Sequence, residues 1–188
     1  LKLILSESNP TPALRRMDGF RLFPFLWPDL RPNLKIDRRF LHFLTQAHGA
    51  LSWFNLLYLQ DRVEDWMVYL LAILSRSRTK ELISFCDRFD LPPRQRRKLI
   101  EQKTGAERIA QEMQKRSHLK PSEIYWLLGE VENEGLLYLM TIARKRYIQK
   151  AVSLYVTSLR RVTPLVDGED LKAMGYVPGP QFRVMRNH

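Results

Sequence analysis

The chain has 188 residues, enough for one substantial hydrophobic core or two small ones. A composition of 45% hydrophobic and 27% charged residues excludes an intrinsically disordered protein, and no apolar run reaches the roughly 20 residues of a membrane-spanning helix. The formal net charge of +11 favours a polyanionic partner such as nucleic acid, although a basic surface can also serve solubility alone. The single cysteine, Cys86, excludes an internal disulfide and favours a reducing, cytoplasmic compartment.

The N-terminal part alternates helix signals with prolines. We expect residues 1–7 to be the end of a helix that begins upstream, in a piece of a longer protein. Thr11-Pro12 predicts the start of a helix that ends at Gly19. Between residues 20 and 33 a proline about every four residues excludes a long helix, whereas the aromatic side chains favour burial. We therefore expect an ordered loop that lies across a core.

From residue 34 onwards, apolar side chains recur at the three- and four-residue steps of an α-helix. The segment 64–74 is apolar nearly all round, which predicts a central helix buried by others. Further helix starts are predicted at Thr79, at Pro92-Pro93 and at Lys120-Pro121. No segment alternates with the period of two that a strand requires, so the predicted fold class is all-α.

We expect this all-α fold to comprise two parts. Residues 1–118 are predicted to form a multi-helix body, which includes the end of the upstream helix at residues 1–7. Residues 119–188 are predicted to form a helical tail, with a basic helix and a short C-terminal helix-loop-helix.

The tail contains a long segment without acidic residues, between Glu134 and Asp167. On a helix, one face would carry Arg146, Lys150, Ser153, Thr157 and Arg161, and the opposite face would be apolar. Such a basic stripe suits a helix that lies on a phosphate backbone. The alternative is a solvated lysine face, but because such faces usually mix charge signs, we favour contact with an anion.

The stretch 163–183 combines turn, helix and charge signals. Asp167 is a good N-cap for a short helix that Gly175 can end, and Gly179-Pro180 predicts the start of a second helix. The free backbone N–H groups at that start, with Arg183 nearby, would form a phosphate-binding site. A helical hairpin packed only for stability is the alternative.

A catalytic site is difficult to assemble from this sequence. It has no Gly-x-x-x-x-Gly-Lys phosphate loop, no His-Glu-x-x-His pair and no Asp-x-Asp pair for magnesium. Glu130, Glu132 and Glu134 alternate, and on a helix alternate residues diverge, which excludes a paired carboxylate site. We therefore expect no catalytic residue, no metal site and no cofactor in this fragment.

Three segments, in order along the chain, resemble the bacterial class II tRNA nucleotidyltransferase and poly(A) polymerase family. They are the N-terminal residues 1–17 with 25–30, the segment 63–72, and residues 168–180. The last is the most specific, because it is similar to the Gly-x-Asp-Leu-x-x-x-Gly-x-x-Pro-Gly-Pro element of the family's C-terminal tail. The sequence departs from the family's apolar final helix at residues 184–188.

The resemblance implies the helical body and tail of an enzyme whose catalytic head lies elsewhere in the parent chain. That head would use Mg²⁺ with ATP or CTP to add CC, A or poly(A) to an RNA 3′ end. This region would grip the acceptor–TΨC arm of tRNA, or another RNA, through backbone phosphates. The expected RNA contacts are Arg146, Lys150, Arg160, Arg161, Lys172, Gly179, Pro180, Gln181, Phe182 and Arg183.

Relatives also imply a homodimer as a further expectation, with no membrane partner. Two other functions stay open. One is a helical protein-interaction or dimerisation module whose basic surface serves only solubility. The other is a helix-hairpin-helix DNA-binding protein, which rests on the turn at residues 175–180.

Overall fold

The computed structural model describes residues 1–28, 36–116, 118–162, 172, 174 and 175. Every regular element in these residues is helical, which confirms the all-α prediction. In chain order they are α1 (Lys2–Leu5), α2 (Thr11–Gly19), α3 (Phe23–Leu26), α4 (Arg38–Asn55), α5 (Asp65–Ile73), η2 (Leu74–Arg76), α6 (Thr79–Arg88), α7 (Pro93–Lys115), α8 (Pro121–Leu128), α9 (Asn133–Ile142), α10 (Arg146–Thr157) and η3 (Leu159–Arg161).

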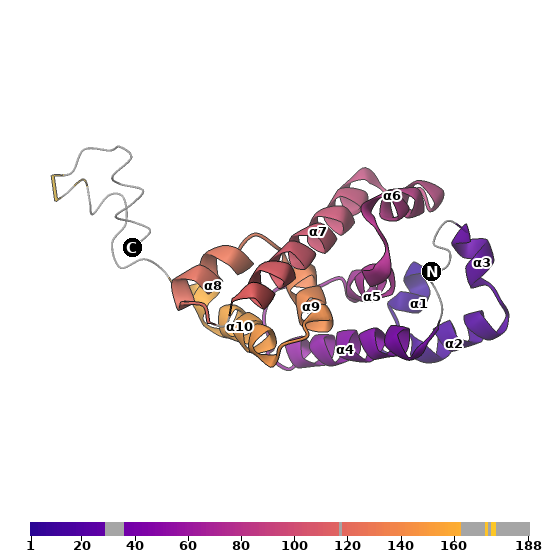
Figure 1. Ribbon diagram of the computed structural model, residues 1–188, viewed down its shortest axis with the longest axis horizontal. Helices are drawn as coiled ribbons and strands as arrows, with labels where there is room; N and C mark the ends of the chain where they lie inside the picture. Colours follow the sequence, from indigo (N-terminus) through magenta and orange to yellow (C-terminus); the bar gives the residue numbers. More distant parts are fainter. Residues whose placement is uncertain (29–35, 117, 163–171, 173, 176–188) are drawn as a thin grey trace.

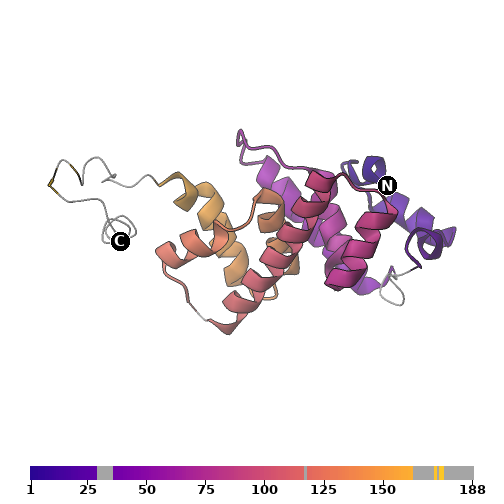
Figure 2. The ribbon, with the colours of Figure 1, turned by 90° about the horizontal axis from the view of Figure 1, so that it is seen from above.

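The described helices form an elongated arrangement. Helices α1 to α3 lie at one end, α8 and α10 lie at the other, and α4 and α7 run between them (Figure 1). Figure 2, turned by 90°, shows the same separation of the two ends. Among the described residues, no helix has the length and apolar character required to cross a bilayer.

Helix α5 lies at the centre of the core. Every residue from Trp66 to Ile73 is buried, and the helix packs against α1, α4, α7 and α9. A helix that is apolar on all sides avoids water only when other helices surround it. The predicted central helix is therefore confirmed.

The loop expected between residues 20 and 33 is described as far as residue 28, and there it differs from the prediction. Phe23 and Trp27 are buried and stack with their ring centroids 5.3 Å apart, but Phe20 and Phe25 are exposed. One turn of helix, α3, places residues 23 and 27 on the same side and residue 25 on the other. Burial of all these aromatic rings was a wrong expectation, because the proline spacing permits this single turn.

Helix α9 has no counterpart among the predicted helices. Most of its residues are buried, from Glu134 to Leu139 without interruption, so no polar face marks a helical period in its sequence. It packs against α4, α5 and α7, and also against α10. The helix thus joins the residues assigned to the predicted body to those assigned to the predicted tail.

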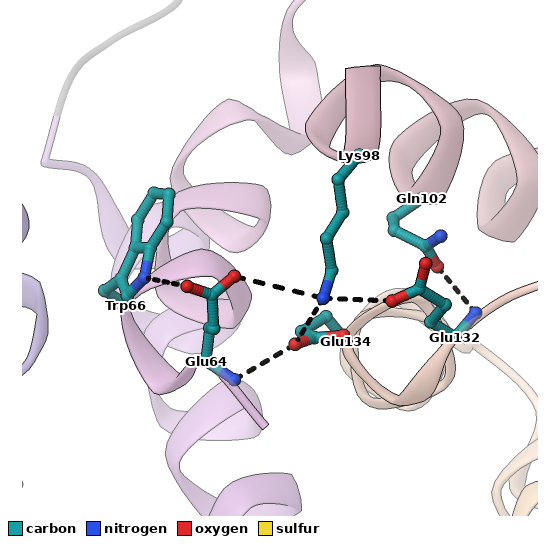
Figure 3. Close-up of polar contacts among 6 residues, drawn as sticks. All are labelled: Glu64, Trp66, Lys98, Gln102, Glu132 and Glu134. Carbon is teal, nitrogen blue, oxygen red and sulfur yellow. Dashed lines mark hydrogen bonds and ion pairs between the residues drawn. The ribbon is translucent and has the colours of Figure 1, made fainter. Parts of the chain in front are cut away.

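An ion cluster holds the start of α9 against α5 and α7 (Figure 3). The Lys98 ammonium of α7 lies 2.9 Å from Glu134 Oε1, 2.9 Å from Glu132 Oε2 and 3.9 Å from Glu64 Oε2. The Glu134 side chain is 2% exposed, so its charge requires this partner. Burial alone would lower the pKa of Lys98, but its hydrogen bonds with Glu134 and Glu132 outweigh burial and raise it.

This cluster corrects the expectation that Glu132 and Glu134 diverge. Glu132 is not helical: it precedes α9 in an extended conformation, whereas Glu134 lies in the first helical turn. The change of backbone conformation between them lets both carboxylates reach Lys98. Glu134 Oε1 also accepts the backbone N–H of Glu64 at 3.0 Å, so a side chain of α9 satisfies a donor at the start of α5.

Two glycines allow α7 to approach α9 and the turn before it closely. A Cβ atom at Gly105 would lie 2.7 Å from Val131 Cγ1, and one at Gly135 would lie 2.4 Å from Gln102 Oε1. Gln102 is buried and its Oε1 accepts the Glu132 N–H at 2.8 Å, so the amide cannot move away without losing this hydrogen bond.

We predict that Gly135→Ala lowers the free energy of unfolding by about 1–3 kcal/mol, the usual cost of overpacking a core. The matched control is Gly49→Ala, in the exposed part of α4, where a Cβ would meet no atom within 4 Å. That control should gain about 0.5–1 kcal/mol from helix propensity. Urea denaturation of both variants measures the difference, and equal changes would contradict the close packing.

We also predict that Lys98→Met lowers the free energy of unfolding by about 3 kcal/mol, because it leaves Glu134 buried without a counter-charge. Arg97→Met, at the adjacent exposed position of α7, serves as the control and should change stability by less than about 0.5 kcal/mol. Chemical denaturation checks both values, and a neutral Lys98→Met would show that the cluster does not stabilise the fold.

Candidate nucleic-acid interface

Helix α10 has one buried and one charged face. Ile148, Val152 and Val156 are completely buried, and the helix packs on α8 and α9. Arg146 and Lys150 are exposed, one turn apart, and neither has an ion pair or hydrogen bond with another described residue. The packing of the apolar face therefore fixes the positions of Arg146 and Lys150 on the exposed face of α10.

The basic helix is shorter than the sequence indicated. It ends at Thr157, whose hydroxyl donates to the Ser153 carbonyl at 2.8 Å, and Ser158 leaves the helical conformation. Residues 159–161 form the separate 3₁₀ turn η3. The single helix predicted to carry all five residues of the stripe thus stops before Arg161.

Arg160 and Arg161 have different surroundings, which the sequence could not distinguish. The Arg160 side chain is 17% exposed, and it donates to Asp61 Oδ2 at 2.6 Å and to Asn133 Oδ1 at 3.0 Å. It thereby ties η3 to the start of α9 and to the loop after α4. Arg161 is exposed and makes no such contact within the described residues.

A cleft of about 690 Å³ lies beside these arginines. It is lined by residues 57–61 of the loop between α4 and α5 and by Arg160 and Arg161 of η3. Tyr58, in this lining, is 88% exposed. None of the loop residues was predicted to be functional, because only the folded chain brings them beside η3.

A second basic group surrounds the start of α10, where Arg144, Lys145 and Arg146 follow one another. Lys145 Nζ donates to the Gln114 carbonyl at 2.7 Å, which holds this corner beside the end of α7. No acidic residue occupies the first turn of α10. The positive end of the helix dipole therefore adds to the side-chain charges, and an anion here would be stabilised.

An aromatic cluster connects α8 to α10. The Tyr125 ring lies 5.3 Å from Trp126 and 6.2 Å from Tyr155, measured between centroids. Burial raises the pKa of Tyr155, as does the nearby Tyr125, while Arg160 acts in the opposite direction. The contact between Tyr125 and Tyr155 holds α8 beside α10.

The remaining predicted contacts lie in the C-terminal stretch. Lys172 is described and exposed. Gly179, Pro180, Gln181, Phe182 and Arg183 lie outside the described residues, so the predicted phosphate site there stays a prediction.

The described residues hold no group of three or more His, Cys, Asp or Glu side chains that could bind a metal ion. Cys86 is buried, and burial is the main cause that raises the pKa of its thiol. His48 Nδ1 lies 3.0 Å from the Tyr69 hydroxyl, in a packing contact between α4 and α5.

No family model matches the chain. The chain is 36% identical over 189 residues to the A-adding tRNA nucleotidyltransferase of Geobacter sulfurreducens, an alignment that covers 97% of the chain and 21% of the relative. The chain therefore spans about a fifth of the length of the curated relative that it matches.

Solved structures with this fold include a tRNA-processing enzyme complex, with a TM-score of 0.75, 19% identity, and coverage of 99% of this chain and 48% of that one. They also include the Thermotoga maritima CCA-adding enzyme complexed with tRNA, with a TM-score of 0.70, 18% identity, and coverage of 97% and 43%. At these identities the likeness shows the fold.

We predict that Arg160→Ala lowers the free energy of unfolding by about 1–2 kcal/mol, because it leaves Asp61 and Asn133 without their shared partner. Arg161→Ala should change it by less than about 0.5 kcal/mol, since that side chain is exposed. Thermal and urea denaturation compare the two variants, and equal effects would contradict the distinct roles of these neighbouring arginines.

Proposed function

The chain has the sequence and the fold of a helical part of the tRNA nucleotidyltransferase family, and on this premise we propose that it binds tRNA by its backbone phosphates. The observation that carries the proposal is the exposed pair Arg146 and Lys150 on α10. This pair lies in a segment without acidic residues, from Gly135 to Val166, and the buried opposite face of α10 fixes its position. A solved protein of the same fold, the Thermotoga maritima CCA-adding enzyme, is itself in complex with tRNA.

Phosphate contacts of this kind suit an RNA duplex. Arg146 and Lys150 are four residues apart, so their Cα atoms are separated by about 6 Å along the helix axis. Cations on a rigid helix can meet successive phosphates without ordering a loop, which reduces the entropic cost of binding. Because the deep major groove of A-form RNA hides the bases, such contacts read shape rather than sequence. The acceptor–TΨC arm is the duplex part of tRNA that we assign to this surface.

The C-terminal stretch would provide a second point of attachment. Lys172 and Arg183 would flank another phosphate, which the backbone N–H groups of Gly179, Gln181 and Phe182 would contact beside Pro180. Two separated contacts would hold the arm at a fixed distance from its 3′ end.

The whole protein would then add nucleotides to the 3′ end of tRNA in the cytoplasm. The names of the relatives, A-adding and CCA-adding, support this reaction class. Catalysis would reside in a head domain that uses Mg²⁺ with ATP or CTP. The part described here would act by positioning the RNA, and the head would select the nucleotide.

We predict that Arg146→Ala combined with Lys150→Ala weakens binding to deacylated tRNA and flattens its salt dependence. Each lost phosphate contact should reduce the log–log slope by about 0.7–0.9. The matched control, Arg94→Ala with Arg97→Ala, removes the same charge from exposed positions near the start of α7, at the other end of that helix from α10. Fluorescence anisotropy titrations over a range of KCl concentrations measure affinity and slope.

Equal losses in the two double variants would mean that net charge alone attracts the RNA. An unchanged affinity for the α10 variant would refute the interface. Size-exclusion chromatography of the chain alone and competition with duplex DNA test the dimerisation and DNA-binding alternatives in the same preparation.

A further inference from the structure

We propose that the cleft between the 57–61 loop and η3 binds one unpaired RNA nucleotide, with its base stacked on Tyr58 and its phosphate against Arg161. The inference rests on the proposed function for its choice of RNA as partner. It adds to that function a site for single-stranded RNA, separate from the duplex contacts of α10.

Tyr58 presents an aromatic ring that the fold does not use. The residue is 88% exposed, and its backbone has a φ of 49°, in the left-handed region that tyrosine rarely adopts. Arg21 and Asp90 have similar φ angles shortly after other helices, so the conformation itself serves to end a helix. Tyr58 differs from them in having a large exposed ring at a position where glycine would adopt the positive φ with less strain.

The η3 side of the cleft is positively charged and is hydrogen-bonded to the 57–61 loop. Arg160 is bonded to Asp61 and Asn133, which fixes the 57–61 loop against η3 and neutralises the Asp61 carboxylate. Among the described residues that line the cleft, this leaves the positive charge of Arg161 unbalanced. An exposed tyrosine, a hydrogen-bonded loop and an unbalanced cation therefore line one cleft.

The size and chemistry of this space favour a nucleotide. The cleft is open to solvent on one side, and its volume of about 690 Å³ is large enough for a nucleotide. Proteins that bind single-stranded nucleic acid combine aromatic rings, on which bases stack, with cations that contact the backbone. A base inside a duplex is already stacked on its neighbours and cannot reach a tyrosine ring, so the ligand must be unpaired.

Two substitutions of Tyr58 in the 188-residue chain test the proposal. Tyr58→Gly removes the ring and relieves the backbone, so the variant should fold at least as stably as the original. Tyr58→Phe keeps the stacking surface and removes only the hydroxyl. Binding to a short single-stranded oligo(U) RNA and to a blunt RNA duplex is measured by fluorescence anisotropy, with thermal unfolding recorded beside it.

We expect Tyr58→Gly to weaken binding of the oligo(U) about 5- to 150-fold, the range of one lost stacking contact. Tyr58→Phe should stay within about twofold of the original chain, and duplex binding should be the same in all three proteins. Arg161→Gln should flatten the salt dependence for the oligo(U) by about 0.7 in log–log slope.

The results separate this inference from the proposed function. If Arg146→Ala with Lys150→Ala weakens duplex binding while Tyr58→Gly binds oligo(U) like the original chain, the cleft proposal is overturned alone. If oligo(U) binding depends on Tyr58 but the chain binds neither duplex nor tRNA, the cleft proposal stands and the proposed function fails. No measurable binding of oligo(U) by the original chain also overturns the cleft proposal.

Discussion

The described structure depends on one buried carboxylate and its partners. Glu134 receives the Lys98 ammonium and the backbone N–H of Glu64, so a single side chain at the start of α9 joins α5 and α7 (Figure 3). A buried charge is costly unless it is paired. The need to pair Glu134 therefore limits how α5, α7 and α9 can be arranged. The neighbouring Asn133 then accepts from Arg160, which extends the same constraint to η3.

The positions of α10 and η3, which carry the candidate interface, therefore depend on the packing of the core. Helix α9 packs against α4, α5 and α7, and also against α10. The charged side chains of α10 and the cleft beside η3 occupy positions that α9 sets. If the chain binds RNA as proposed, changes to the Lys98 cluster would act on binding indirectly, through the position of α10, whereas changes to Arg146 and Lys150 would act on it directly.

Local signals in the sequence were sufficient to predict many of the helices of this fold. Prolines marked the starts of α7 and α8, since the first turn of a helix does not need their missing N–H groups. The apolar segment around α5 indicated a central helix. Helix α9 is also buried on nearly all sides, but it was not predicted because Gly135 in its first turn weakens the helix signal and no polar face marks a helical period. The short turn α3 was not predicted because prolines discouraged any helix there.

The candidate site was less predictable, because its parts are distant in the sequence. Arg160 and Asp61 are 99 residues apart, and nothing in either local sequence indicates their pairing. The exposed tyrosine of the cleft becomes notable only when η3 lies opposite it. Arg146 and Lys150 could be predicted as exposed cations because that prediction needs only the helical period of the local sequence. The role of the C-terminal stretch stays a prediction.

The central claim is that this chain holds the acceptor–TΨC arm of tRNA by its phosphates. Hydroxyl-radical footprinting of deacylated tRNA, with and without the chain at saturating concentration, tests it most directly. The account predicts protection of backbone positions in the acceptor and TΨC stems and none in the anticodon arm. Protection centred on the anticodon arm, or a cleavage pattern that the chain does not change, would contradict it.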